Sequence, residues 1–174
     1  MVNYRRSKLP GGTYFFTVTL RNRKSTLLID HIDLLKESIF KTKQTFPFKT
    51  LATVVLPDHL HVIWQMPEGD DDSKRWQKIK SHFTQGVLKR GLVLKRNERG
   101  EYPLWQRRFW EHTIRDDRDL SNPVNYIHYN PVKHHLLKHV MDWKYSTFHY
   151  YVKKKILPPD WGFDGIHQGG DFGE

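Results

Sequence analysis

Two histidines separated by a single residue are the first candidates for chemistry. His59 and His61 flank Leu60 within a largely apolar run. On a β-strand, residues i and i+2 point to the same face, so the two imidazoles would lie side by side and could bind one divalent ion. The alternative is a pair of structural histidines, because a chain with 11 His can contain this spacing by chance.

A tyrosine and an asparagine form the second candidate pair. Tyr126 and Asn130 are four residues apart and would share one face of a helix, presenting a phenol and an amide ligand together. Alternatively, Tyr126 packs in the core and Asn130 only ends the helix before Pro131. With a metal on the histidines, the tyrosine oxygen could attack a phosphodiester and become covalently joined to DNA. A phenol with a pKa of about 10 also needs a base, which the sequence does not identify.

Charge and aromatic content favour a nucleic-acid partner. The chain has 174 residues, a net charge of +10, and 6 Trp, 8 Tyr and 10 Phe. This composition is typical of a surface that neutralises phosphates and stacks bases, although a generally basic surface is the alternative. The absence of Cys excludes disulfide scaffolds, thiol catalysis and sulfur-based zinc fingers.

The apolar stretches, such as residues 51–56, are far shorter than the roughly 18 residues that a membrane span needs. We therefore expect a soluble cytoplasmic protein, associated with the nucleoid through its DNA partner.

The elements that must position these residues follow from the hydrophobic pattern. Strands are expected at residues 13–20, 51–56, 59–64 and, within the stretch 105–114, a fourth. Between the first two lies a helix from Ile32 to about Lys43, with Asp30 as its N-cap and Ile32, Leu35, Ile39 and Phe40 on its apolar face. A second helix carries Trp76, Ile79, Phe83 and Val87 at helical spacing.

A last helix would start at Leu120 or Ser121, with Pro123 in its first turn and Val124, Ile127 and His128 on one side. The order predicts an α+β protein, a ferredoxin-like split βαββαβ antiparallel sheet with helices on one face. Residues 1–151 would form one catalytic domain, and residues 152–174 a basic, then Gly- and Asp-rich, C-terminal tail. Residues 89–103 are expected to form a basic loop that either follows phosphates or is merely solvated.

Several motifs in a fixed order carry a family resemblance. They lie at residues 4–6, 11–18, 55–64, 67–70, 105–112 and 126–134. Together these segments resemble the REP-associated tyrosine transposases, a branch of the single-tyrosine transposases that share the His-hydrophobe-His motif. The resemblance implies a ferredoxin-like fold and a dependence on Mg²⁺ or Mn²⁺. It also implies cutting and rejoining of single-stranded DNA at palindromes that fold into hairpins.

The resemblance assigns roles to individual residues. It places the metal on His59 and His61, the nucleophile on Tyr126, and a third metal ligand on Asn130, where related transposases often have Gln. Tyr129 is a rival nucleophile by chemistry, but on a helix it points about 60° away from Tyr126, on the other side from Asn130. The resemblance to this branch implies a monomer, with a dimer as the alternative.

DNA contacts are expected from eight residues: Arg5, Arg6, Gly11, Gly12, Arg107, Arg108, Trp110 and Lys133. The first four resemble the region near the foot of the hairpin, where Gly lets a DNA strand approach closely. The alternative is a flexible basic N-terminus. Two other functions stay open: a non-catalytic module that binds hairpin DNA or RNA, and a metal hydrolase that uses His59, His61 and another His such as His112.

Overall fold

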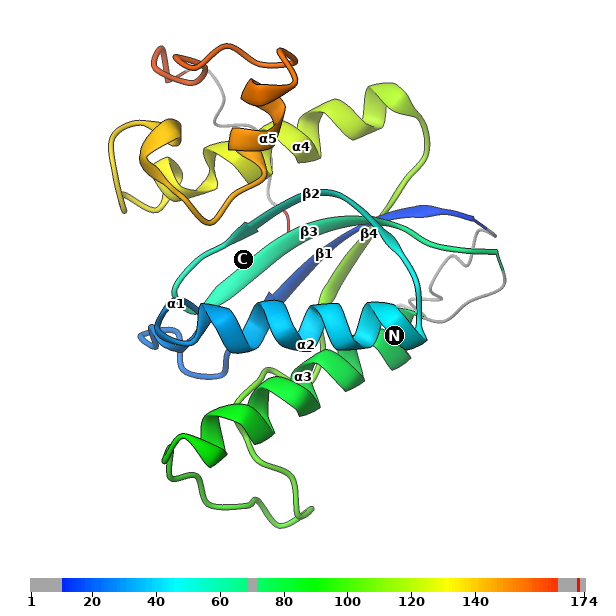
Figure 1. Ribbon diagram of the computed structural model, residues 1–174, viewed down its shortest axis with the longest axis vertical. Coiled ribbons are helices and arrows are strands. Elements are labelled where there is room, and N and C mark those ends of the chain that lie inside the picture. The colour runs from blue at the N-terminus through cyan, green and yellow to red at the C-terminus, as the bar shows by residue number, and fades with distance from the viewer. Residues whose placement is uncertain (1–10, 69–71, 166–171, 173–174) are drawn as a thin grey trace, which may run out of the picture.

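A four-stranded antiparallel sheet forms the centre of the protein (Figure 1). The computed structural model describes residues 11–68, 72–165 and 172. The strands are β1 (Thr13–Thr19), β2 (Lys49–Val55), β3 (His59–Gln65) and β4 (Trp110–Ile114), in the spatial order β2-β3-β1-β4. This order and the intervening helices confirm the ferredoxin-like α+β prediction. β4 starts later than the first residue of its predicted stretch, because Trp105 makes only an isolated bridge to Leu20.

The two helices of the βαββαβ unit, α2 (Ile32–Thr45) and α3 (Asp72–Lys89), lie on one face of this sheet, as predicted, and the last helix, α4 (Asp117–Lys133), covers the other face (Figure 1). The one-turn helix α1 (Leu27–Asp30) lies on the same side as α2 and α3. In β3, Leu60, Val62 and Trp64 pack toward α2 and α3, whereas Ile63 packs in the cluster that contains Tyr126 of α4. A strand that is buried on both faces needs a cover on each side.

The helix around residues 32–45 differs from its prediction in two details. Asp30 ends the one-turn helix α1, and His31 is the N-cap of α2. Phe40 is 61% exposed, whereas Leu35 is fully buried. Five residues of helix rotate the side chain by about 140° relative to Leu35, which turns Phe40 away from the core. The four predicted core residues of α3, from Trp76 to Val87, are all buried.

The helix that carries Tyr126 begins earlier than its pattern indicates. The Asp116 carboxylate accepts hydrogen bonds from the backbone N–H groups of Arg118 and Asp119, and this N-cap starts α4 at Asp117. Pro123 therefore lies beyond the first turn, in contrast to the prediction. The helix continues through Pro131 to Lys133 and buries Val124, Ile127 and His128, as predicted.

The chain after α4 returns over the same side of the sheet. It forms a 3₁₀ turn, η1 (Val140–Asp142), and a short helix, α5 (Phe148–Lys153). Within the expected tail, Leu157 and Trp161 pack against a cluster that contains Tyr129, Val140 and Phe148. No helix among the described residues combines the length and the apolar content that a membrane span requires.

Candidate active site

The two candidate metal ligands lie side by side in the middle of the sheet. His59 and His61 are on β3, which is flanked by β1 and β2, and both side chains are buried. Their ring centroids are 4.9 Å apart and the ring planes are nearly perpendicular, at 83°. The i, i+2 geometry expected from the sequence is therefore present.

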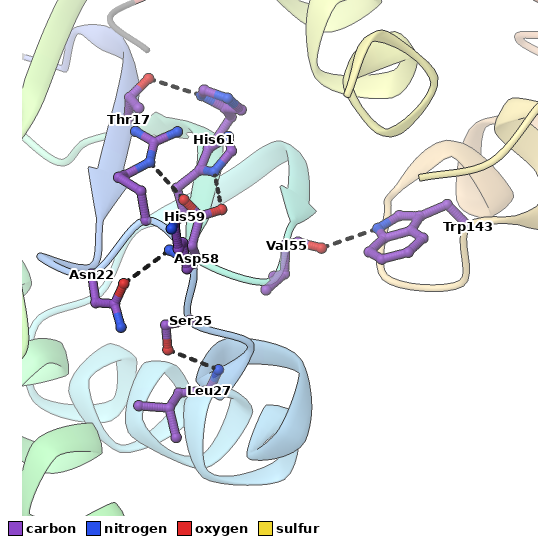
Figure 2. Close-up of polar contacts among 11 residues, drawn as sticks. Thr17, Asn22, Ser25, Leu27, Val55, Asp58, His59, His61 and Trp143 are labelled. Carbon is purple, nitrogen blue, oxygen red and sulfur yellow. Dashed lines mark hydrogen bonds and ion pairs between the residues drawn. The ribbon is translucent and has the colours of Figure 1, made fainter. Parts of the chain in front are cut away.

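A hydrogen bond to Nδ1 orients each imidazole (Figure 2). His59 Nδ1 lies 2.8 Å from Asp58 Oδ1, and Arg23 Nε pairs with the other oxygen of Asp58 at 2.6 Å. Burial raises the pKa of Asp58, but the hydrogen bond to His59 and the charge of Arg23 outweigh it and hold that pKa below its usual value. Asp58 is thus ionised and accepts a hydrogen bond from His59 Nδ1–H.

The tautomer of His61 follows from its partner Thr17 on β1. The Thr17 hydroxyl donates its proton to the backbone carbonyl of Phe172, at 2.6 Å, and lies 2.8 Å from His61 Nδ1. A hydroxyl can donate only one hydrogen bond, so the Thr17 oxygen accepts a hydrogen bond from His61 Nδ1–H. With Nδ1 protonated in both rings, either imidazole would bind a metal through Nε2.

Tyr126 faces this pair from α4. Its ring centroid is 5.3 Å from that of His61 and 6.1 Å from that of Phe15, and the side chain is 3% exposed. Lys133, which we expected to contact DNA, donates a hydrogen bond from Nζ to the Tyr126 hydroxyl, at 3.1 Å, and lies 4.7 Å from the ring centroid. An ammonium at this distance favours the phenolate form of a tyrosine.

Asn130 lies on α4 between two residues that each contact one histidine. Tyr126 is one turn before it and faces His61, whereas His134 is one turn after it and lies 5.1 Å from His59, measured between ring centroids. The Asn130 side chain is fully buried. This spacing places Asn130 on the face of α4 that is turned toward the histidine pair, as the i, i+4 spacing predicts.

Among the described residues, no third His, Asp or Glu side chain completes a metal site with the pair. Across residues 11–68, 72–165 and 172, no group of three or more such side chains could hold a metal ion. His112, the third ligand of the metal-hydrolase alternative, instead lies 3.5 Å from an Asp119 oxygen and stacks on Trp110. The candidate donors among the described residues are therefore the two imidazoles and the buried amide of Asn130.

Phe172 lies over Tyr126 from the C-terminal segment. Its ring centroid is 4.6 Å from that of Tyr126 and 5.0 Å from that of Phe15. Its backbone carbonyl accepts the Thr17 hydrogen bond described above. A DNA strand that approaches Tyr126 from this side must displace the Phe172 ring.

The residues expected to contact DNA are spread over several elements. Arg5 and Arg6 lie outside the described residues. Gly11 has φ +68°, a left-handed conformation that favours glycine, and the Gly12 carbonyl accepts from the Met66 N–H.

Arg107 and Arg108 are exposed on the bend before β4. Trp110 is half-buried, with its ring against Phe15 at a centroid distance of 5.8 Å, so part of its stacking surface is already used.

Tyr129, the rival nucleophile, faces away from the histidines. It belongs to the cluster formed with Val140 and Phe148, and a Cβ added at Gly162 would lie 3.3 Å from its ring. The buried environment of Tyr129 is therefore separate from that of Tyr126.

Comparisons with known proteins show which family this chain resembles. The family model described as "Transposase IS200 like" matches residues 10–130. A REP-associated tyrosine transposase of Escherichia coli K12 is 47% identical over 165 residues, which cover 94% of this chain and 93% of the relative. A corresponding transposase of Haemophilus influenzae is 46% identical over 165 residues, with coverage of 93% and 94%.

A solved structure of a REP-associated tyrosine transposase bound to a REP hairpin superposes with a TM-score of 0.87. It is 46% identical to this chain, and the match covers 100% of this chain and 98% of the solved one.

Proposed function

Since this chain belongs to the IS200-like transposases and, among them, to the REP-associated tyrosine transposases, we propose that it nicks and rejoins single-stranded DNA at palindromic hairpins through a covalent phosphotyrosine intermediate. The observation that carries the proposal is the contact between the rings of Tyr126 and His61. It brings a nucleophile and a candidate metal ligand together within one chain.

Tyr126 is the nucleophile in this proposal. Its oxygen attacks the scissile phosphorus, a phosphotyrosine ester forms, and the bond from phosphorus to one DNA oxygen breaks. The phenol gives up its proton to solvent, and the DNA oxygen takes up a proton from solvent and leaves as a hydroxyl. Attack by a DNA hydroxyl on the phosphotyrosine reverses these steps and rejoins the strand. Lys133 Nζ, at 3.1 Å, stabilises the negative charge of the phenolate oxygen before the attack and after its release.

The side chains around Tyr126 fit a divalent metal, Mg²⁺ or Mn²⁺. His59 and His61 would hold it through Nε2, because Asp58 and Thr17 engage Nδ1 of each ring. The amide oxygen of Asn130 would be the third protein ligand. When bound, the metal supplies polarisation of the scissile phosphate and offsets the charge that develops on it.

A DNA hairpin is the proposed partner. The solved relative is bound to a REP hairpin, and this chain carries a net charge of +10 that suits a polyanion. We also propose that one chain suffices as a monomer, because His59, His61, Tyr126 and Asn130 are brought together without a second copy.

Electrophoresis under denaturing conditions tests this function. A labelled single-stranded hairpin is incubated with the protein and Mg²⁺ or Mn²⁺. We expect a slow, protease-sensitive labelled band that Tyr126→Phe abolishes. Tyr129→Phe is the matched control and should retain the band, because Tyr129 packs on another side of α4.

The same experiment separates the other candidate functions. Binding without an adduct across several hairpins and both metals would favour the non-catalytic binding module. Cleavage without an adduct would favour a metal hydrolase, in which water rather than tyrosine attacks the phosphate.

A further inference from the structure

A cationic surface lies on the sheet face away from Tyr126. A cavity of about 940 Å³ opens between α3 and the chain that leads into β4. Figure 1 shows α3 and the connection after it on the side of the sheet opposite α4. The charged residues that line this α3 groove are Arg21, Lys80, Arg96, Arg99, Arg107 and one acid, Glu101. Positive charge therefore strongly exceeds negative charge in the groove, and none of the catalytic candidates lines it.

Lys80 is the most buried of these cations. Its Nζ donates a hydrogen bond to the Gln106 carbonyl, at 2.9 Å, and lies 5.9 Å from the Trp105 ring centroid and 5.8 Å from that of Phe109. Burial lowers the pKa of Lys80 to about 8. No carboxylate in the described part of the chain forms an ion pair with it. The fold thus holds an ammonium in a partly desolvated position, facing a cavity.

The walls of the α3 groove are fixed by hydrogen bonds. Trp105 Nε1 donates to the Thr84 hydroxyl, which in turn donates to the Lys80 carbonyl. On the opposite wall, Arg96 lies over the Tyr102 ring, at 4.6 Å from its centroid, and donates to the Gly100 carbonyl.

The turn that carries the remaining cations is also ordered. The side-chain oxygen of Asn97 accepts from the backbone N–H groups of Arg99 and Glu101, at 3.0 and 2.9 Å. The cations of residues 96–99 are therefore held on a defined turn rather than on a freely moving loop.

We propose that the α3 groove binds the phosphates of a single-stranded DNA segment that flanks the hairpin, outside the catalytic site. Closely spaced cations beside aromatic side chains are typical of surfaces that track an unpaired strand. A duplex would offer its backbone to the rim but could not place bases against Trp105 or Tyr102 inside the cavity. This inference rests on the proposed function, since it assumes a DNA substrate.

The chain that lines the groove continues into β4, whose side chains reach the catalytic face. Phe109 lies 5.7 Å from Phe16, between ring centroids, on the α3 side of the sheet. The next residue, Trp110, packs against Phe15 on the Tyr126 side. β4 is an edge strand, so a DNA strand can pass from the groove around this edge toward Tyr126.

Binding of two DNA probes tests the proposal. One probe is a hairpin with a single-stranded extension, and the other is the same hairpin with a blunt end. Fluorescence anisotropy should show that Lys80→Met weakens binding of the extended probe about tenfold, as loss of a charged hydrogen bond does. The slope of log affinity against log salt should fall by about one for that probe. Affinity for the blunt probe should not change.

Lys78→Met is the matched control, because Lys78 is exposed on the same helix and does not line the groove. It removes the same charge and should leave binding of both probes unchanged. The double substitution Arg96→Gln and Arg99→Gln alters exposed positions only and should reproduce the Lys80→Met result.

Two outcomes would overturn the proposal. Equal weakening for both probes would place the hairpin stem, not the flanking strand, in the α3 groove. No weakening for either probe would show that the groove does not bind DNA. Failure of the proposed function is distinguishable from both, because it would appear as the absence of a covalent adduct in the wild-type protein.

Discussion

The Lys133 ammonium lies 3.1 Å from the Tyr126 hydroxyl oxygen, two helical turns along α4. Because this contact favours the phenolate, Lys133→Met should slow covalent adduct formation at saturating DNA by about 100-fold, the loss typical of one electrostatic stabiliser. Hairpin affinity should stay nearly constant. Lys138→Met, at an exposed position after α4, is the control. If Lys133 acts mainly on DNA phosphates, affinity will fall and the rate at saturation will not.

Asp58 should control how strongly the histidine pair binds metal. Asp58→Asn keeps the shape of the side chain but removes the charge that holds His59 Nδ1–H. Partners of this kind typically contribute 10- to 100-fold, so the metal concentration that gives half-maximal adduct formation should rise by about 10-fold or more. Arg23→Gln, which keeps the carboxylate, should give a smaller rise. An unchanged metal requirement in Asp58→Asn would contradict the orientation assigned to His59.

Phe172 should restrain access to Tyr126. Its ring lies 4.6 Å from the Tyr126 ring, between centroids, and must leave before a strand can reach the hydroxyl from that side. Removal of a partly buried aromatic contact of roughly 1.5 kcal/mol corresponds to about a tenfold gain in the open population. Single-turnover kinetics of Phe172→Ala should therefore show faster adduct formation. Phe163→Ala, at an exposed position, serves as the comparison; a rate at or below wild type in Phe172→Ala would refute the restraint.

Lys80 should lower the free energy of unfolding. Its pKa falls from 10.5 in the unfolded chain to about 8 in the fold, so below pH 8 the fold holds a charge that it disfavours. At about 1.4 kcal/mol for each pKa unit, the cost of burying this charge is roughly 3 kcal/mol. Substitution of Lys80 removes that cost but also removes the hydrogen bond to the Gln106 carbonyl, which is worth about 1 kcal/mol.

Denaturant unfolding should therefore show Lys80→Met to be about 2 kcal/mol more stable than wild type at pH 7. Wild-type stability rises as pH increases from 8 to 10.5, because only the unfolded chain still binds the proton there. The advantage of the variant should shrink over that interval. A destabilised variant at pH 7 would mean that Lys80 contributes packing or hydrogen bonds that outweigh its desolvation.

Local patterns were sufficient to predict the residues that lie close in sequence. Alternation along a strand placed His59 and His61 side by side, and helical spacing placed Tyr126 and Asn130 on one face. The contact between Thr17 and His61 spans 44 residues and exists only because β1 pairs with β3 in a particular register. No local pattern encodes that register.

Contacts between residues far apart in the chain could not be predicted from the sequence for the same reason. Phe172 reaches Thr17 across 155 residues, and nothing in a Gly- and Asp-rich segment indicates where it packs. The proximity of Lys133 to Tyr126 was available from their spacing of seven residues, which is close to two helical turns. Asp58, adjacent to His59, could likewise have been found as its partner.

Mapping the DNA-linked residue by tandem mass spectrometry tests the central claim most directly. The covalent adduct is digested with nuclease and trypsin, and the peptide of residues 119–133 is fragmented, since it contains both Tyr126 and Tyr129. A nucleotide on Tyr126 is the result that this account predicts. A nucleotide on Tyr129, or cleaved DNA with no modified peptide, would contradict it.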